Sequence, residues 1–187
     1  MKARLAYSTI SQLSYIVLGA LLATQASIIG SMMHIAMHAF AKITLFFAAG
    51  AVLVAAHKSE ISDMAGLGRA MPITFGAFFV ASLSIIGLPP LGGMWSKWYL
   101  GLGTIESGQW LLLTVLLVSS LLNIAYLLPI PMRAFFGKPK DGTVHTRMRE
   151  APASCLVAMI ITSLACLVMF FYPEPFYRLA TTIAGAQ

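Results

Sequence analysis

Five long apolar segments constrain the fold of this 187-residue chain more than any other feature. They cover residues 5–23, 28–56, 72–105, 110–135 and 152–172. A helix needs about 20 apolar residues to cross the hydrocarbon core of a bilayer. Only 10% of the residues are charged, against about 25% in soluble domains. The sequence therefore predicts an all-α, polytopic membrane helix bundle with about five transmembrane crossings.

The third apolar segment is too long for one straight crossing. As a single helix it would extend about 50 Å, well beyond a hydrocarbon core of about 30 Å. Pro89 and Pro90 remove backbone donors in its middle, and Gly92 and Gly93 permit non-helical turns. We therefore expect one discontinuous crossing that is interrupted at these four residues.

The basic residues outside the apolar segments divide unequally between the two sides of five alternating crossings. One side receives Lys2, Arg4, Lys58, Arg69, Arg133, Lys138, Lys140, Arg147 and Arg149, and the other receives only Arg178. The positive-inside rule then predicts a cytoplasmic N-terminus and a C-terminus on the periplasmic side of a bacterial inner membrane. The net charge of +6 is explained by this topology, so we expect a lipid bilayer and no nucleic acid as a partner.

Three ionisable side chains follow one another inside the second apolar segment. His34, His38 and Lys42 are spaced by four residues, which places them on one face of a helix. A lysine at the centre of a membrane costs about 2.5–3.5 kcal/mol even on the lenient insertion scale. Imidazole titrates near neutral pH and can pass a proton between its two nitrogens. The pattern therefore favours a proton relay over a set of polar residues that only hold helices together.

Lys97 lies just beyond the predicted helix break. Broken helices in transporters expose backbone carbonyls that coordinate ions and water, which favours a functional lysine. The neighbouring Trp95, Trp98 and Tyr99 could instead form an interfacial aromatic belt, with Lys97 extending to the membrane surface. The residue pattern alone leaves both interpretations open.

The first apolar segment is rich in polar side chains, of which Ser8, Ser11 and Gln12 are candidates to support a relay. They would either line a hydrated path or bind a neighbouring helix. Lys2 precedes them, and the charge pattern favours a plain membrane anchor for it. No cluster of metal ligands, catalytic triad or nucleotide-binding loop is evident, and we expect no cofactor in this chain. Cys155 and Cys166 are about 16 Å apart on a helix and cannot form a disulfide there.

Four ordered motifs resemble the antiporter-like membrane subunits of respiratory complex I, of Mrp-type sodium/proton antiporters and of related membrane hydrogenases. They are the run from Arg4 to Tyr15, the His34–His38–Lys42 series, the run from Gly66 to Pro72, and the run from Gly87 to Lys97. The resemblance implies that His34, His38 and Lys42 form the central hydrophilic axis, with Lys97 on the exit side of the proton path and Lys2 also on that path. Residues 1–136 would be the C-terminal half of the proton-translocating domain, and residues 137–187 a cytoplasmic loop, a last transmembrane helix and a tail.

Members of this family have about fourteen crossings in two inverted halves, and only the last five are evident here. The resemblance therefore implies a first half elsewhere, which would carry the glutamate and lysine of the entry half-channel, and further membrane subunits as partners. The short basic loop after the fourth crossing favours the D-type subunit of an Mrp antiporter. One alternative is a proton-pumping subunit of NADH-quinone oxidoreductase, in which the whole complex would be an enzyme, or of a related membrane hydrogenase. The other is a non-conducting fragment that fills a subunit interface. The membrane segments contain no Asp or Glu, so they offer protons a better path than sodium.

Overall fold

A computed structural model describes residues 1–138 and 150–185. These residues form helices joined by short turns, without a β-strand in either range. Lys140, Arg147 and Arg149 of the predicted basic loop lie outside the described residues. Four helical stretches are long and apolar enough to cross a membrane, and a shorter apolar helix, Pro72–Ile86, belongs to the divided crossing. The predicted membrane helix bundle with one discontinuous crossing is confirmed.

The long helix α2 (Gln25–Ala56) is the centre of the bundle. The helices that pack against it are α1 (Lys2–Leu22), α3 (Pro72–Ile86), α4 (Gly93–Glu106), α7 (Ala153–Phe171) and α8 (Glu174–Gly185). At 1.5 Å per residue it is about 48 Å long, so it extends beyond a bilayer core unless it tilts. It begins three residues earlier than the hydropathy predicts, because Thr24 and Ser27 bond to each other's backbone N–H at 3.2 and 3.1 Å. This capping box satisfies two free donors at the helix start.

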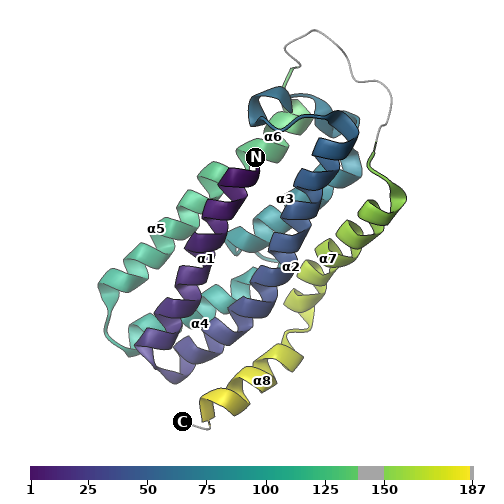
Figure 1. Cartoon of the computed structure of the whole chain (residues 1–187). Coiled ribbons are helices and arrows are strands. Elements are labelled where there is room, and N and C mark those ends of the chain that lie inside the picture. The colour runs from purple at the N-terminus through teal and green to yellow at the C-terminus, as the bar shows by residue number, and fades with distance from the viewer. Residues whose placement is uncertain (139–149, 186–187) are drawn as a thin grey trace.

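The third crossing divides as the sequence predicts. Helix α3 (Pro72–Ile86) ends at Gly87, whose φ of 91° lies in the left-handed region that favours glycine. Helix α4 (Gly93–Glu106) begins where the backbone passes close to the end of α3. A Cβ atom on Gly93 would lie only 1.8 Å from the Ser84 carbonyl oxygen. In Figure 1, α3 and α4 occupy opposite ends of the bundle with the break between them.

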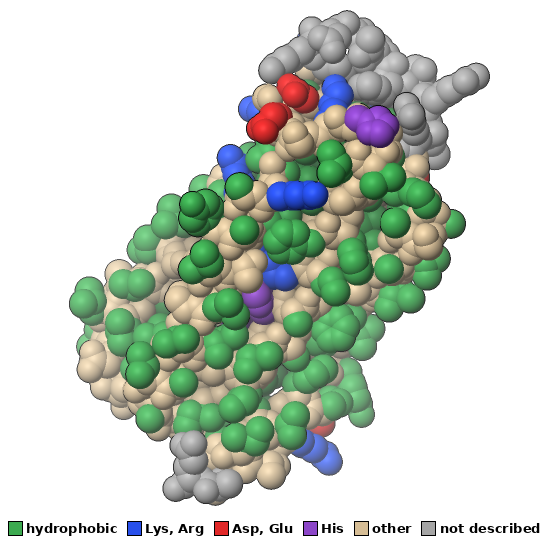
Figure 2. Space-filling view, in the orientation of Figure 1, with side chains coloured by type: hydrophobic (Ala, Val, Ile, Leu, Met, Phe, Trp, Pro, Cys, Tyr) green, Lys and Arg blue, Asp and Glu red, His purple; other side chains and the backbone are tan. Residues whose placement is uncertain are grey.

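The remaining helices complete the surface of the bundle. Helix α5 (Trp110–Leu127) continues into α6 (Pro129–Phe136) across the predicted proline-containing end of the fourth crossing. Two short 3-10 helices, Ile61–Asp63 and Leu67–Arg69, connect α2 to α3. Figure 2 shows apolar side chains over most of the visible surface and charged ones gathered mainly at its ends, as expected for a membrane protein.

The C-terminal residues form a helix that the hydropathy pattern does not reveal. We expected a short tail after the fifth crossing, whereas residues Glu174–Gly185 form α8, which packs against α2 (Figure 1). Its polar residues include the ion pair between Arg178 and Glu174, with 2.6 Å between Nε and Oε1. Its buried face contains Ala180 and Ala184. An amphipathic helix of this kind has too few consecutive apolar residues to be found by a search for membrane spans.

Glu150 supplies the cap that the start of α3 lacks. Met71, the residue before α3, makes no side-chain bond to the helix. Instead, one carboxylate oxygen of Glu150 accepts hydrogen bonds from the backbone N–H groups of Ile73 and Thr74 at 2.7 and 3.3 Å. The other accepts from the Thr74 hydroxyl at 2.6 Å. A carboxylate at a helix N-terminus also interacts favourably with the helix dipole. Because Glu150 lies just before α7, these bonds join the segment before α7 to the start of the discontinuous crossing.

Candidate functional site

The three ionisable residues of α2 lie in a row on its buried face, and we call them the α2 ladder. His34, His38 and Lys42 are 2%, 7% and 5% exposed. The two imidazole rings are stacked, with centroids 5.7 Å apart and planes inclined by 12°. The Nε2 atoms of both histidines are buried and have no hydrogen-bond partner among the described residues. A buried ring nitrogen without a partner costs free energy unless water or another group satisfies it.

The lysine end of the ladder meets α1. Lys42 donates a hydrogen bond to the backbone carbonyl of Leu5 at 3.2 Å. Leu5 is fully buried one turn into α1, near the end of the bundle where the terminal amine of Met1 bonds to Ser59 at 2.9 Å. The Lys42 amine thus lies toward the end of the bundle that carries the N-terminus.

The histidine end of the ladder meets α4 directly after the helix break. Nδ1 of His34 and the hydroxyl of Ser96 are 2.9 Å apart, and the donor depends on the imidazole tautomer. The Ser96 hydroxyl also lies 3.0 Å from the carbonyl of Gly93, to which it donates when Nδ1 of His34 carries the hydrogen. Because Ser96 precedes Lys97 in the chain, this contact places the ladder next to the second buried lysine. Ser96 is a member of the site that we did not identify from the sequence.

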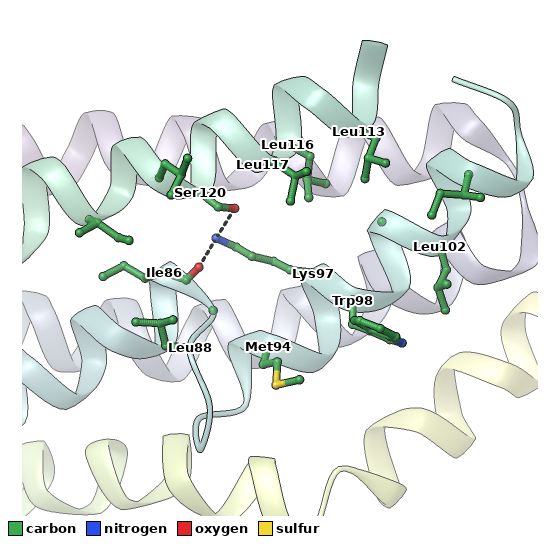
Figure 3. Close-up of a pocket in the computed structure, with 15 residues that line it drawn as sticks. Ile86, Leu88, Met94, Lys97, Trp98, Leu102, Leu113, Leu116, Leu117 and Ser120 are labelled. Carbon is green, nitrogen blue, oxygen red and sulfur yellow. Dashed lines mark hydrogen bonds between the residues drawn. The ribbon is translucent and has the colours of Figure 1, made fainter. Parts of the chain in front are cut away.

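Lys97 points into the protein rather than toward the membrane surface. It is 8% exposed, and its amine donates to the carbonyl of Ile86 at 2.8 Å and to the hydroxyl of Ser120 at 3.1 Å. Figure 3 shows the side chain crossing the space between α4 and α5 toward these two acceptors. Ile86 is the last residue of α3, so its carbonyl has no hydrogen-bond partner within the helix. The Lys97 amine satisfies this acceptor. This position argues against a lysine that extends to the surface.

A cavity of about 590 Å³ surrounds the Lys97 side chain. Its walls come from the helix break, α4 and α5, and Figure 3 shows that they are mostly apolar, with Leu88, Trp98 and Leu117 among them. The predicted break residues Pro89 and Pro90 are exposed at the surface, whereas Gly92 and Gly93 are buried. Gly92 donates its backbone N–H to the carbonyl of Cys166 on α7 at 2.9 Å, which fixes the break against that helix.

Tyr15 of α1 connects the ladder to Lys97. Its ring meets His34 edge to face, with centroids 5.7 Å apart. The Lys97 amine lies 5.4 Å from the centroid of the same ring, within the range of a cation–π contact. The Tyr15 hydroxyl donates to Ser119 on α5 at 2.6 Å. We did not predict this residue, although it lies on the same face of α1 as Ser8 and Gln12, which was the signal available.

The supporting polar residues of the first segment have different positions. Ser8 and Gln12 are buried, and both take part in hydrogen bonds between α1 and α5. Ser11 is half-buried and lines a separate cavity of about 380 Å³. Lys2 is exposed at the start of α1 and lines a third cavity together with Lys58 and other residues. The structure thus brings Ser8 and Gln12 into the interior and leaves Lys2 apart from the ladder.

The cysteines are both free, as predicted, with Cys155 exposed and Cys166 buried. Within residues 1–138 and 150–185, no three His, Cys, Asp or Glu side chains are grouped so that they could hold a metal ion.

The chain is similar in sequence and in fold to several known membrane proteins. The chain is 39% identical to the N subunit of NADH-quinone oxidoreductase from Desulforudis audaxviator, over 91% of its own length and 36% of that protein. It is 31% identical to the D-type subunit of a Na(+)/H(+) antiporter from Alkalihalophilus pseudofirmus, over 96% of this chain and 36% of that one. A structure of the Mrp complex from a Dietzia species contains a similar fold, with a TM-score of 0.87, 23% identity, and coverage of 97% of this chain and 41% of that one.

The chain therefore spans little more than a third of the length of these curated relatives. The model of a protein family described as "NADH:quinone oxidoreductase/Mrp antiporter, TM" matches residues 1–123, which is well over half of the chain. With its several membrane-crossing helices, its buried ladder and its divided third crossing, this chain belongs to that family of multi-pass membrane proteins.

Proposed function

We propose that this chain carries protons through a membrane as part of a multi-subunit complex. The observation that supports the proposal best is a series of contacts that leads from the histidines of the α2 ladder to Ser96, the residue before Lys97. It runs through the stacked rings of His34 and His38 and the 2.9 Å contact between His34 and Ser96. A row of buried ionisable groups is costly in a membrane, and such groups commonly mark a proton path.

In this proposal the three ladder residues and Lys97 each hold a proton in turn. His34 and His38 pass it through their ring nitrogens, with water at the two unpartnered Nε2 atoms. Ser96 connects His34 to α4, and Lys97 exchanges the proton at the helix break. The exposed position of Lys2 favours an anchoring role at the membrane surface. We further propose that the conducting helices lie within residues 1–136, and that residues 137–187 form a loop, a last transmembrane helix and a tail. The N-terminus would lie on the cytoplasmic side of the membrane.

The comparisons favour a redox-driven complex over the Mrp-type antiporter that the loop lengths suggest. The identity to the N subunit of NADH-quinone oxidoreductase is 39%, against 31% to the D-type antiporter subunit. We therefore infer that proton movement in this chain is driven by quinone reduction in partner subunits. Exchange of protons for sodium is the second candidate, and its support is the relative named as a component of a Na(+)/H(+) antiporter. Other membrane subunits, and the part of the relatives that this chain does not cover, are the expected partners.

Proteoliposomes that contain the assembled complex and an internal pH indicator distinguish these functions. We expect the internal pH to change when NADH and a quinone are supplied, and to stay constant when only a sodium gradient is imposed. A response to the sodium gradient alone would assign the chain to an antiporter. If the complex is intact and neither driving force moves protons, the proposal fails in favour of a non-conducting chain at a subunit interface.

A further inference from the structure

The cavity around Lys97 is a long groove between α4 and α5. We call it the Lys97 cavity and define it by the helix break, the face of α4 from Met94 to Ile105 and the face of α5 from Leu113 to Ile124. Each of these two faces is about 17 Å long at 1.5 Å per residue. With a volume of about 590 Å³, the cavity lies within the size range of sites for small molecules.

The rim of the Lys97 cavity is apolar and exposed. Trp98 of α4 is 57% exposed, and Leu117 and Leu121 of α5 are 55% and 65% exposed. Helix α5 belongs to a stretch that is long and apolar enough to cross a membrane, so this rim lies at the depth of the hydrocarbon. A ligand that enters the cavity over these side chains must therefore dissolve in the bilayer.

The polar groups of the Lys97 cavity are gathered at one place. Among the described lining residues, Lys97 and Ser120 carry the only polar side chains apart from the indole of Trp98. Figure 3 shows the Lys97 amine beside Ser120, with Leu102 and Leu113 well away from it along the groove. The cavity therefore combines one cationic group with a long apolar wall, which suits a ligand with a polar head and a hydrocarbon chain.

The Lys97 amine can still bind one more acceptor. An ammonium group has three donors, and the bonds to the Ile86 carbonyl and the Ser120 hydroxyl use two of them. Both acceptors are neutral, and within residues 1–138 and 150–185 no Asp or Glu side chain is paired with Lys97. The Ser120 hydroxyl accepts from the amine and keeps its own hydrogen to donate. Because buried charges are stable only when they are paired, these two donors favour an anionic head group.

We propose that the Lys97 cavity binds a long-chain carboxylic acid, with the carboxyl group at Lys97 and Ser120 and the hydrocarbon chain along α4 and α5. The acid enters the bilayer core in its neutral form. Transfer of its proton to the Lys97 amine then leaves a carboxylate beside an ammonium group. The carboxylate oxygens accept hydrogen bonds from this group and from the Ser120 hydroxyl, and such charge-assisted bonds are strong. The apolar walls of the cavity remove the chain from contact with other solvent.

The depth of Lys97 in the membrane favours a free acid over a phospholipid. Lys97 lies nine residues before Glu106, the last residue of α4, which is about 14 Å along the helix axis. Half of a hydrocarbon core is about 15 Å, so the lysine lies near the middle of the membrane. A charged phosphate group stays at the membrane surface because its burial is costly, whereas a neutral carboxylic acid can reach this depth.

Photolabelling of the assembled complex in liposomes tests this site. The probe is palmitic acid with a light-activated diazirine in its chain and a terminal alkyne for detection. We expect the probe to attach to peptides of α4 and α5, and unlabelled palmitic acid should compete with it. Hexadecanol has the same chain length but no carboxyl group. It should compete about tenfold less well, because it cannot form an ion pair with Lys97.

Three variants show whether the labelled position is the Lys97 cavity. Gly101 lines the cavity, and a Cβ added there would meet only Leu113 at 3.8 Å, so Gly101→Leu places its side chain in the open space. It should reduce the labelling of α4 and α5 by about tenfold or more. The matched control, Gly76→Leu, adds the same side chain to α3 outside the cavity and should leave labelling unchanged. Lys97→Gln keeps a donor for the Ile86 carbonyl without the charge, so palmitic acid and hexadecanol should then compete equally.

Equal competition by palmitic acid and hexadecanol in the wild-type complex would overturn the proposal and leave the cavity as a groove for lipid tails of any kind. Absence of the probe from α4 and α5 would also overturn it, because another helix of the complex would then fill the groove. Labelling is compared at equal amounts of intact complex on a native gel. None of these results depends on proton transport, so acid binding and the proposed function can fail separately. Inhibition of transport by a bound acid, which would occupy the Lys97 amine, is the one consequence that rests on the proposed function.

Discussion

Replacing Lys97 with arginine should abolish proton transport while the complex still assembles. Arginine keeps the positive charge and can still bond to the carbonyl of Ile86 and the hydroxyl of Ser120, but it does not release its proton at physiological pH. We therefore expect proton flux to fall by about tenfold or more, toward the leak of the liposomes. Proton uptake in proteoliposomes and the amount of intact complex on a native gel are the two measurements.

Two further variants separate the charge of Lys97 from its ability to exchange a proton. Lys97→Met keeps the length of the side chain but leaves the Ile86 carbonyl without its donor, so flux and the amount of complex should both decrease. Lys138→Arg makes the same chemical change as Lys97→Arg at an exposed position, and it should have no effect on either. Wild-type flux in an assembled Lys97→Arg complex would show that Lys97 does not carry protons.

Replacing Gly93 with alanine should disrupt the discontinuous crossing more than the same replacement at any other glycine of α3 or α4. The added Cβ of Gly93→Ala would lie 1.8 Å from the carbonyl oxygen of Ser84 and 2.9 Å from its carbonyl carbon. Both are backbone atoms, so α3 and α4 must move apart, which displaces Ser96 and Lys97. Overpacking of this kind costs about 1–3 kcal/mol or more. We expect less assembled complex, a lower unfolding temperature and a loss of flux.

Gly76 offers a matched control for this experiment. It lies within α3, and a Cβ added there would meet no atom within 4 Å. Gly76→Ala should therefore assemble normally and leave the unfolding temperature equal or slightly higher, because alanine favours a helix. If Gly93→Ala and Gly76→Ala unfold at the same temperature, the close approach of the two half-helices does not determine stability.

The helix bundle was predictable because its determinants are local in the sequence. The length and composition of each apolar segment indicate a crossing, and Pro89, Pro90 and the adjacent glycines indicate the break. The burial of His34, His38 and Lys42 on one face follows from their spacing alone. The early start of α2 depends on a single capping box at Thr24, which hydropathy does not register.

The remaining parts of the site depend on contacts between distant residues. Ser96 joins the ladder only because the break turns α4 so that its hydroxyl faces His34, 62 residues away. The role of Tyr15 depends on how α1 packs against α4 and α5, which the sequence of α1 does not specify. Hydropathy does not reveal α8, because this helix is amphipathic and buries only one face, against α2. In each case the determining interaction is tertiary rather than local.

Proton flux in proteoliposomes that contain the Lys42→Met complex tests the central claim most directly. Methionine keeps the unbranched, apolar shape of the lysine side chain and removes only the amine that bonds to Leu5 at the end of the ladder. We expect the complex to assemble in normal amounts and its proton flux to fall by about tenfold or more. Wild-type proton flux from an equal amount of Lys42→Met complex would contradict a proton path along the α2 ladder.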